Sequence, residues 1–309
     1  MRSPTGQLQE NGMPPSSIQL FDAHAHFFTN DIERYPVDVT GARETPEALM
    51  ERLNRDPSTA ARVLSLWDEC GVTGGAAVQY NTVYKTDNSY TLDVADAHPD
   101  RVAAVLILRA NEAGAPALLD TLAGSRNVSG LRLFGYPDAD GNYPWLDSPA
   151  ALATWDVAAA HGLAMVVMYA PGKPSHAALR RIIALARRYP QTVIALDHCG
   201  WPGVEQGDAG TIGAEHLELV DVPNIHFKFT QINFNRFAET GIDAAAFVKR
   251  LVDTYGAARV MWGSDYGNTQ NSYAEMVEQA IAATALLDDA DRAAVLHDNG
   301  ARLFGGKRG

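Results

Sequence analysis

Cysteine is scarce in this 309-residue chain, which holds only Cys70 and Cys199, far apart in the sequence. We therefore expect no disulfide framework, and a reducing cytoplasm is the default location. No apolar run approaches the roughly 20 residues that a transmembrane helix needs. Positive charge is also in deficit, since 25 Lys and Arg stand against 37 Asp and Glu, a formal net charge of −12. This balance argues against nucleic acid or an anionic membrane as a partner, although local arginines could still hold an anionic small molecule.

The first 17 residues are polar, include Pro14 and Pro15, and lack the apolar stretch of a signal peptide. We expect them to form a disordered tail. The remaining residues, 18–309, are expected to form one domain, because α/β barrels of this size commonly fold as a single unit. The 46% of hydrophobic residues is enough for a large core. The sequence does not identify an oligomeric state, and a homo-oligomer stays open.

The chain is organised around residues 18–28, IQLFDAHAHFF. An apolar run with Leu20 and Phe21 predicts a short buried strand that ends in His24 and His26. Because side chains alternate along a strand, the two imidazoles are expected on the same face. Such a pair can hold a metal ion, or it can direct protons and hydrogen bonds at a substrate.

The rest of the sequence alternates strand and helix patterns. Strands are expected at 18–26, 75–80, 101–108, 128–134, 163–170, 192–198, 225–229 and 259–263. Helices are expected at 56–70, 89–97, 112–123, 149–161, 175–189, 216–220, 244–255, 273–284 and 290–297. Eight such units predict an α/β fold, a (β/α)8 TIM barrel with a C-terminal extra helix. A doubly wound sheet is the alternative, but it would carry a Gly-rich phosphate turn where this chain carries histidines.

The segment from Thr29 to Asp56 is rich in Pro, Gly, Asn and charge, and we expect it to be an irregular loop. Most connections after a barrel strand are short. A segment of this length therefore indicates a functional loop or a lid over the site.

In a TIM barrel the carboxyl ends of the strands meet at one mouth, where active sites form. The side chains expected there are His24, His26, Tyr80, Asn81, Arg132, Tyr169, Asp197, His198, Lys228 and Asp265. Three of these residues could instead have structural roles. Asp197 could orient a neighbour, Arg132 could pair with a buried acid, and Lys228 could extend out of the barrel. The four remaining histidines in or beside helices are expected at the surface: His161, His176, His216 and His297.

Three short motifs resemble the amidohydrolase superfamily: HAH at 24–26, LDH at 196–198 and WGSD at 262–265. The closing DNGARLFG, 298–305, is similar to the terminal helix of the amidohydrolase-related group. Two longer stretches, VQYNTVYKTDN at 78–88 and LDHCGWP at 196–202, resemble the 2-pyrone-4,6-dicarboxylate lactonases and their sugar-lactonase relatives. The resemblance implies a cytoplasmic hydrolase that opens a lactone, in aromatic or sugar-acid catabolism.

The sequence departs from that family in two places. Metal-dependent members carry a histidine ligand at the end of the fifth strand, where this chain has Met168 and Tyr169, and Arg132 stands where a bridging lysine would be. A binuclear centre is therefore not expected. Tyr266-Gly267 replaces the Trp-Pro of relatives, which changes the pocket wall. The lactonase resemblance implies catalysis without a metal, and the alternative is one Zn²⁺ held by His24, His26, Asp265 and His198.

The expected mechanism assigns Asp265 as the general base that activates water against a lactone carbonyl. His24, His26 and His198 would donate hydrogen bonds to the carbonyl oxygen and stabilise the oxyanion. Arg132 and Arg236 are candidate clamps for a substrate carboxylate. The expected pocket lining comprises Asn81, Tyr84, Asn88 and Tyr169.

Three alternatives remain open from the sequence. One is a mononuclear zinc decarboxylase or hydrolase in which His198 acts as acid and base. Another is a lactone isomerase, which would use the same histidines to move a proton or an acyl group. A barrel that binds a ligand without catalysis would keep the pocket but lack a competent base, so Asp265 argues against it.

Overall fold

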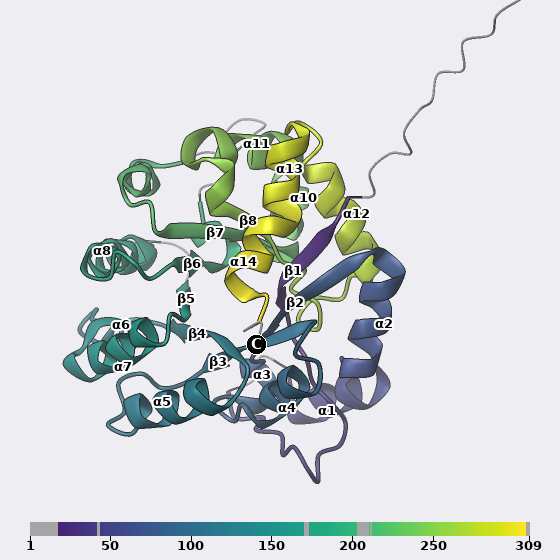
Figure 1. Cartoon of the computed structure of the whole chain (residues 1–309), viewed down its shortest axis with the longest axis vertical. Coiled ribbons are helices and arrows are strands. Elements are labelled where there is room, and N and C mark those ends of the chain that lie inside the picture. The colour runs from purple at the N-terminus through teal and green to yellow at the C-terminus, as the bar shows by residue number, and fades with distance from the viewer. Residues whose placement is uncertain (1–17, 42–43, 170–172, 203–209, 211, 307–309) are drawn as a thin grey trace, which may run out of the picture.

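The structure is a computed structural model that describes residues 18–41, 44–169, 173–202, 210 and 212–306. The tail predicted for residues 1–17 lies outside these residues. Eight parallel strands follow one another around the sheet in chain order. They are β1 (Leu20–Ala25), β2 (Val72–Val78), β3 (Val102–Ile107), β4 (Val128–Gly135), β5 (Ala164–Tyr169), β6 (Ile194–Leu196), β7 (Ile225–Phe229) and β8 (Val260–Trp262). The predicted TIM barrel is confirmed (Figure 1).

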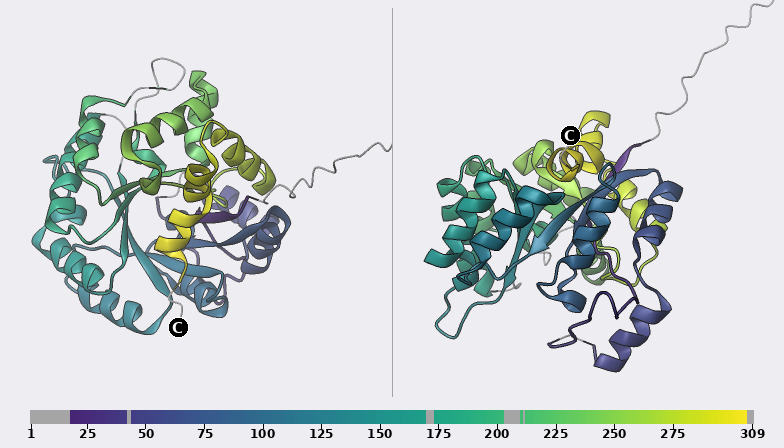
Figure 2. Two further views of the ribbon diagram at one scale, coloured as in Figure 1. Left: turned by 45° about the horizontal axis from the view of Figure 1, so that its top comes forward. Right: turned by 60° about the horizontal axis from the view of Figure 1, so that its bottom comes forward.

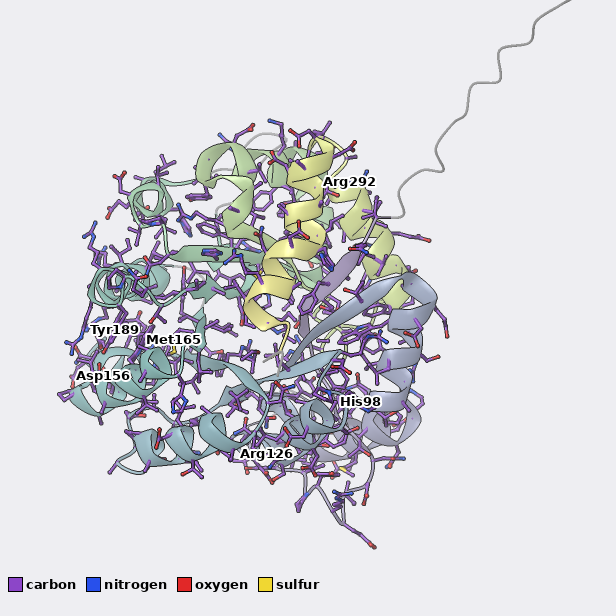
Figure 3. All side chains as sticks on the ribbon, in the orientation of Figure 1. His98, Arg126, Asp156, Met165, Tyr189 and Arg292 are labelled. Carbon is purple, nitrogen blue, oxygen red and sulfur yellow. The ribbon has the colours of Figure 1, made fainter. Side chains whose placement is uncertain are left out.

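Helices surround the strands on the outside (Figure 1). They are α1 (Pro46–Arg55), α2 (Ala60–Cys70), α3 (Asn81–Tyr84), α4 (Ser89–Ala97), α5 (Ala115–Ser125), α6 (Pro144–Asp147), α7 (Pro149–Ala160), α8 (Lys173–Arg188), α9 (Ala214–Leu217), α10 (Gln231–Thr240), α11 (Ala244–Tyr255), α12 (Tyr273–Ala283), α13 (Asp289–Ala293) and α14 (Asn299–Phe304). Apolar side chains fill the layer between strands and helices, where Met165 of β5 and Tyr189, just after α8, share one core cluster (Figure 3). Among the described residues, no helix is both long and apolar enough to cross a membrane.

The first and last strands are joined by hydrogen bonds just beyond their regular pairing. The backbone N–H of Asp265 donates to the His24 carbonyl at 2.7 Å, and that of His26 donates to the Tyr266 carbonyl at 2.9 Å. Below them, the buried Asp22 carboxylate accepts from the Ser264 backbone at 2.8 Å and from its hydroxyl at 2.6 Å. These bonds bring the two histidines of β1 beside the aspartate that follows β8.

The end of the barrel opposite this mouth is closed by α14. Phe304 from this helix is fully buried and shares an inner cluster with Phe21 of β1, Val105 of β3 and Met261 of β8. Figure 2 shows α14 at one end of the barrel and the segment with α1 at the other. Among the described residues, α14 therefore fills this end of the barrel, and the strand ends near α1 form the opposite mouth.

The sequence prediction missed the short helices α3 and α6, and it also missed the longer α1 and α10. The segment 29–56 was expected to be irregular throughout, but residues 46–55 form α1, which begins at the N-cap Thr45 and buries Leu49 and Leu53. Helix α10 was also not predicted, although Thr230 and Asn233 form a capping box at its start. The predicted final helix, 290–297, instead runs through a π-helical turn at 294–298 into α14.

One predicted side-chain orientation is wrong, and the outward alternative for Lys228 is excluded. His216 was expected at the surface, but it is only 5% exposed, and its Nε2 lies 2.6 Å from the Gly200 carbonyl oxygen. Lys228 does not extend out of the barrel: it is fully buried, with its Nζ 4.9 Å from the centre of the Phe304 ring. The side chain of His176 lies outside the described part of the chain.

Candidate active site

Three side chains from the two joined strands converge at the mouth. The Nε2 atoms of His24 and His26 lie 3.3 Å apart. Asp265 Oδ1 lies 3.5 Å from the first of these nitrogens and 3.2 Å from the second. All three residues are buried. The structure therefore brings the histidine pair and Asp265 together, as the sequence predicted.

The outer nitrogen of each imidazole is already bonded. His26 Nδ1 lies 2.8 Å from the Val78 carbonyl oxygen, which can only accept, so this nitrogen carries a proton. His24 Nδ1 lies 3.2 Å from Asp197 Oδ1. Burial lowers the pKa of His24 to about 3 against the attraction of Asp197, so the ring is neutral and its Nδ1 is the donor. A neutral His24 therefore directs a bare lone pair at Asp265.

Three lone-pair atoms in mutual contact repel one another unless a positive charge lies among them. A shared proton satisfies this need, and so does a metal ion. A tetrahedral ion with bonds of about 2.0–2.1 Å separates its ligand atoms by roughly 3.3–3.4 Å, close to the three observed distances. The residues therefore fit a single divalent cation, held by His24, His26 and Asp265. His198, the fourth predicted ligand, lies farther out, with its ring centre 6.0 Å from that of His24.

Asp197 holds the other end of the histidine pair in place. Its Oδ2 accepts from Arg132 Nε at 2.8 Å, and its Oδ1 lies 3.2 Å from Lys228 Nζ. Burial opposes ionisation, but Lys228, His24 and Arg132 together hold the pKa of Asp197 well below its usual range. The carboxylate is therefore charged and fixes the proton of His24 on Nδ1. Arg132, predicted as a substrate clamp, is thus engaged with a buried acid.

Asp265 lies in a tight turn with a left-handed backbone, φ 59°. Its second oxygen, Oδ2, accepts a hydrogen bond from Asn268 Nδ2 at 3.0 Å. Burial would raise the pKa of this carboxyl, but the hydrogen-bond contact with His26 and the proximity of His24 and His198 outweigh burial and lower it. The strained turn and the lowered pKa are both typical of a functional carboxylate.

His198 is the third imidazole of the site. It lies in a 3-10 turn after β6 with a left-handed backbone, φ 53°, and Asn233 Nδ2 donates to its carbonyl oxygen at 3.1 Å. Its Nδ1 lies 2.7 Å from the Thr230 hydroxyl, which also accepts a bond from the backbone at the start of α10. The Thr230 proton is therefore available for Nδ1, which leaves the His198 Nε2–H as a donor. Burial lowers the pKa of His198, in keeping with a neutral ring.

Arg236 comes from α10, the helix that the sequence prediction missed. Its guanidinium carbon lies 5.5 Å from the centre of the Trp201 ring, and that ring lies 5.0 Å from the His198 ring. The buried Nη1 atom of Arg236 has no hydrogen-bond partner among the described residues. An unsatisfied guanidinium nitrogen beside a site imidazole is a candidate contact for an anionic or oxygen-rich substrate.

The other predicted pocket residues have mostly structural contacts. Tyr169 donates to the Gly200 carbonyl at 2.7 Å, and the Tyr84 hydroxyl accepts from the Thr29 backbone at 3.0 Å. The Asn88 side chain bonds both backbone groups of Ile107 at 2.9 Å. Asn81 opens α3 beside Tyr80, and its side chain is half-buried. Asn268 and Thr230, which orient Asp265 and His198, were not predicted, because neither belongs to a recognisable motif.

The sequence is similar to a known family and to one lactonase. The profile of the amidohydrolase family matches residues 21–306. The chain is 30% identical over 185 residues to L-fucono-1,5-lactonase from Burkholderia ambifaria, a match that covers 58% of this chain and 60% of the relative. The chain therefore aligns with less than two thirds of that relative's length.

Solved structures share the fold. One is a Pseudomonas putida protein that carries the provisional name 2-pyrone-4,6-dicarboxylic acid hydrolase; it has a TM-score of 0.67 and 24% identity, over 93% of this chain and 98% of that one. Another is an amidohydrolase from Burkholderia multivorans with bound Zn, which has a TM-score of 0.67 and 20% identity, over 92% of this chain and 98% of that one.

Proposed function

Because the chain belongs to the amidohydrolase family, we propose that it is a lactone hydrolase that opens the internal ester of a sugar acid or a related carboxylated ring. The observation that carries the proposal is the convergence of Asp265, an ionised carboxylate, with three buried imidazoles at the barrel mouth. The likeness to L-fucono-1,5-lactonase supports a lactone as the substrate class.

The chemistry follows from the protons in the site. Asp265 accepts a proton from the attacking water as the new C–O bond forms at the carbonyl carbon. The His198 Nε2–H donates a hydrogen bond to the carbonyl oxygen, where negative charge develops. The ring C–O bond then breaks, and the proton taken by Asp265 passes to the departing alkoxide. The product is the open hydroxy acid, so water is the only co-reactant.

His24 and His26 take a different role from the one first expected. Their outer nitrogens are bonded to Asp197 and Val78, so a neutral ring has no proton left to donate to substrate. We assign them instead to holding Asp265 and the positive charge beside it. In the buried centre, the cations Arg132 and Lys228 stand against three buried acids, Asp22, Asp197 and Asp265, which leaves one positive charge missing. A shared proton is then sufficient, and the proposed hydrolysis proceeds without a metal.

A zinc-dependent hydrolase or decarboxylase is the second candidate, and one observation favours it. The distances among His24 Nε2, His26 Nε2 and Asp265 Oδ1 match the edges of a tetrahedral zinc site. A divalent cation held there would polarise the substrate carbonyl and lower the pKa of water. Arg236 and His198 would keep the same substrate contacts in either case.

The proposal is tested by assaying the purified protein on L-fucono-1,5-lactone, other sugar-acid lactones and 2-pyrone-4,6-dicarboxylate. Wild type should open at least one lactone class, and Asp265→Asn should abolish turnover while the circular dichroism spectrum stays the same. Wild-type rates in the Asp265→Asn variant would remove the proposed base. Decarboxylation without lactone opening would favour the second candidate.

A further inference from the structure

Arg52 on α1 lies at the border of the mouth and contacts it through Tyr80 and through the Gly267 carbonyl, which accepts from Nη1 at 3.4 Å. Its Nη2 donates to the Tyr80 hydroxyl at 3.1 Å, and its Nε and Nη2 donate to Glu44 at 3.0 and 2.9 Å. The guanidinium carbon lies 5.6 Å from the centre of the Phe28 ring and 5.8 Å from that of Tyr80. Because its side chain is only 18% exposed, this arginine is an organised part of the site border and not a surface charge.

Tyr80 continues the chain of contacts into the catalytic group. Its hydroxyl lies 3.5 Å from Asn268 Oδ1, and Asn268 Nδ2 donates to Asp265 Oδ2 at 3.0 Å. Its ring stacks on the His26 imidazole, with centres 4.8 Å apart. Burial raises the pKa of Tyr80, so the hydroxyl keeps its proton at neutral pH. One residue therefore contacts both sides of the catalytic group, the imidazole and the amide that bonds the carboxylate.

The hydrogen bonds run in one direction. Arg52 can only donate, so the Tyr80 oxygen accepts from it and directs its own proton at the Asn268 carbonyl oxygen. That bond orients the Asn268 amide with its N–H groups toward Asp265. Fixing Oδ2 in this way leaves Oδ1 for the histidines and for the proton of water.

We infer that Arg52 and Tyr80 are positioning residues, which act on the catalytic carboxylate through the amide of Asn268. The inference rests on the proposed role of Asp265 as the base. It also assigns a function to the segment that carries α1: through Tyr80 and Asn268 this segment positions the base, in addition to bordering the mouth.

The test compares Tyr80→Phe, Arg52→Gln and Arg52→Lys with the double variant Arg52→Gln/Tyr80→Phe. Each of the first two should lower kcat about tenfold with little change in KM, because the base is mispositioned and substrate contacts remain. Arg52→Lys should recover part of kcat. The double variant should be no slower than the slower single variant, because both changes break the same chain.

Arg55→Gln is the matched control: Arg55 lies on the same helix, is exposed, and pairs only with Glu51 at 3.7 Å among the described residues. It should behave as wild type. A second measurement does not depend on turnover. The backbone N–H of Asn268 donates to the Asp265 backbone carbonyl at 3.2 Å, and its hydrogen exchange should speed up in Tyr80→Phe and Arg52→Gln. Absence of lactone opening in wild type would overturn the proposed function and leave the exchange test standing. Unchanged exchange together with additive losses of kcat in the two single variants would overturn the inference.

Discussion

The Nε2 atoms of His24 and His26 face each other at 3.3 Å, and neither ring has a free proton when neutral. This contact is unfavourable by itself, because two lone pairs meet beside the Asp265 carboxylate. The contact between the two Nε2 atoms is favourable only when one positive charge lies between them and Asp265. The site is therefore built to hold a proton or a cation against Asp265, and that charge tunes the proposed base.

The ion pairs around Asp197 predict a large loss of stability in Asp197→Asn. The change leaves Arg132 and Lys228 as buried cations that have lost their carboxylate partner. Breaking a buried pair from one side costs about 3–5 kcal/mol of unfolding free energy. Urea denaturation at pH 7 measures it. The control Asp253→Asn removes the exposed partner of Lys249, and a loss in Asp197→Asn as small as in this control would contradict the buried arrangement.

The buried His226 should make the free energy of unfolding fall at acid pH. It is 6% exposed, its Nδ1 has no hydrogen-bond partner among the described residues, and burial together with Arg302 and Arg259 lowers its pKa to about 4. Between pH 6.5 and 4 the unfolded chain binds a proton at this residue and the folded chain does not. Stability therefore falls as the pH falls, by about 1.4 kcal/mol per pH unit from this group.

His226→Leu should remove that dependence. The variant should lose less unfolding free energy than wild type between pH 7 and pH 4.5, measured by urea denaturation at both values. Parallel losses in the two proteins would show that His226 does not titrate as its burial implies.

Arg236 predicts a dependence on substrate charge. Its buried Nη1 is unsatisfied and would gain a charge-assisted hydrogen bond from a carboxylate or a negatively charged oxygen. Arg236→Gln should raise KM about tenfold or more for a carboxylated lactone and much less for a neutral one. Steady-state kinetics on both substrates measures the difference. Equal effects on the two lactones would show that Arg236 does not bind the substrate's charge.

Much of this site could be predicted from residue patterns. The alternation in residues 18–28 places two imidazoles on one face, and the apolar runs before Asp197 and Asp265 mark strand ends at the same mouth. Strand 225–229 was predicted with the bounds that the structure has. These features depend on local periodicity and on the geometry of parallel strands, which a sequence displays directly.

Other features depend on contacts between distant residues. Lys228 faces inward because Asp197 and the Phe304 ring receive it, and neither is near it in the sequence. Helix α1 buries Leu49 and Leu53 at helical spacing, but it follows a stretch rich in Pro, Gly and charge, so the whole segment was taken as one loop. Helix α10 begins at a capping box directly after β7, where the prediction expected a loop. The proton positions on His24 and His26 follow from partners on other strands, so the sequence favoured a donor role that the contacts do not support.

The most direct test of the account is lactone hydrolysis measured together with metal content, before and after chelation. The account predicts that the chelated protein, shown to hold no stoichiometric metal, keeps its rate, and that Asp265→Asn lacks activity with or without added Zn²⁺. Loss of activity on chelation, with recovery at about one zinc per chain, would contradict it. His24, His26 and Asp265 would then be ligands of a catalytic zinc ion, and the second candidate function would replace the first.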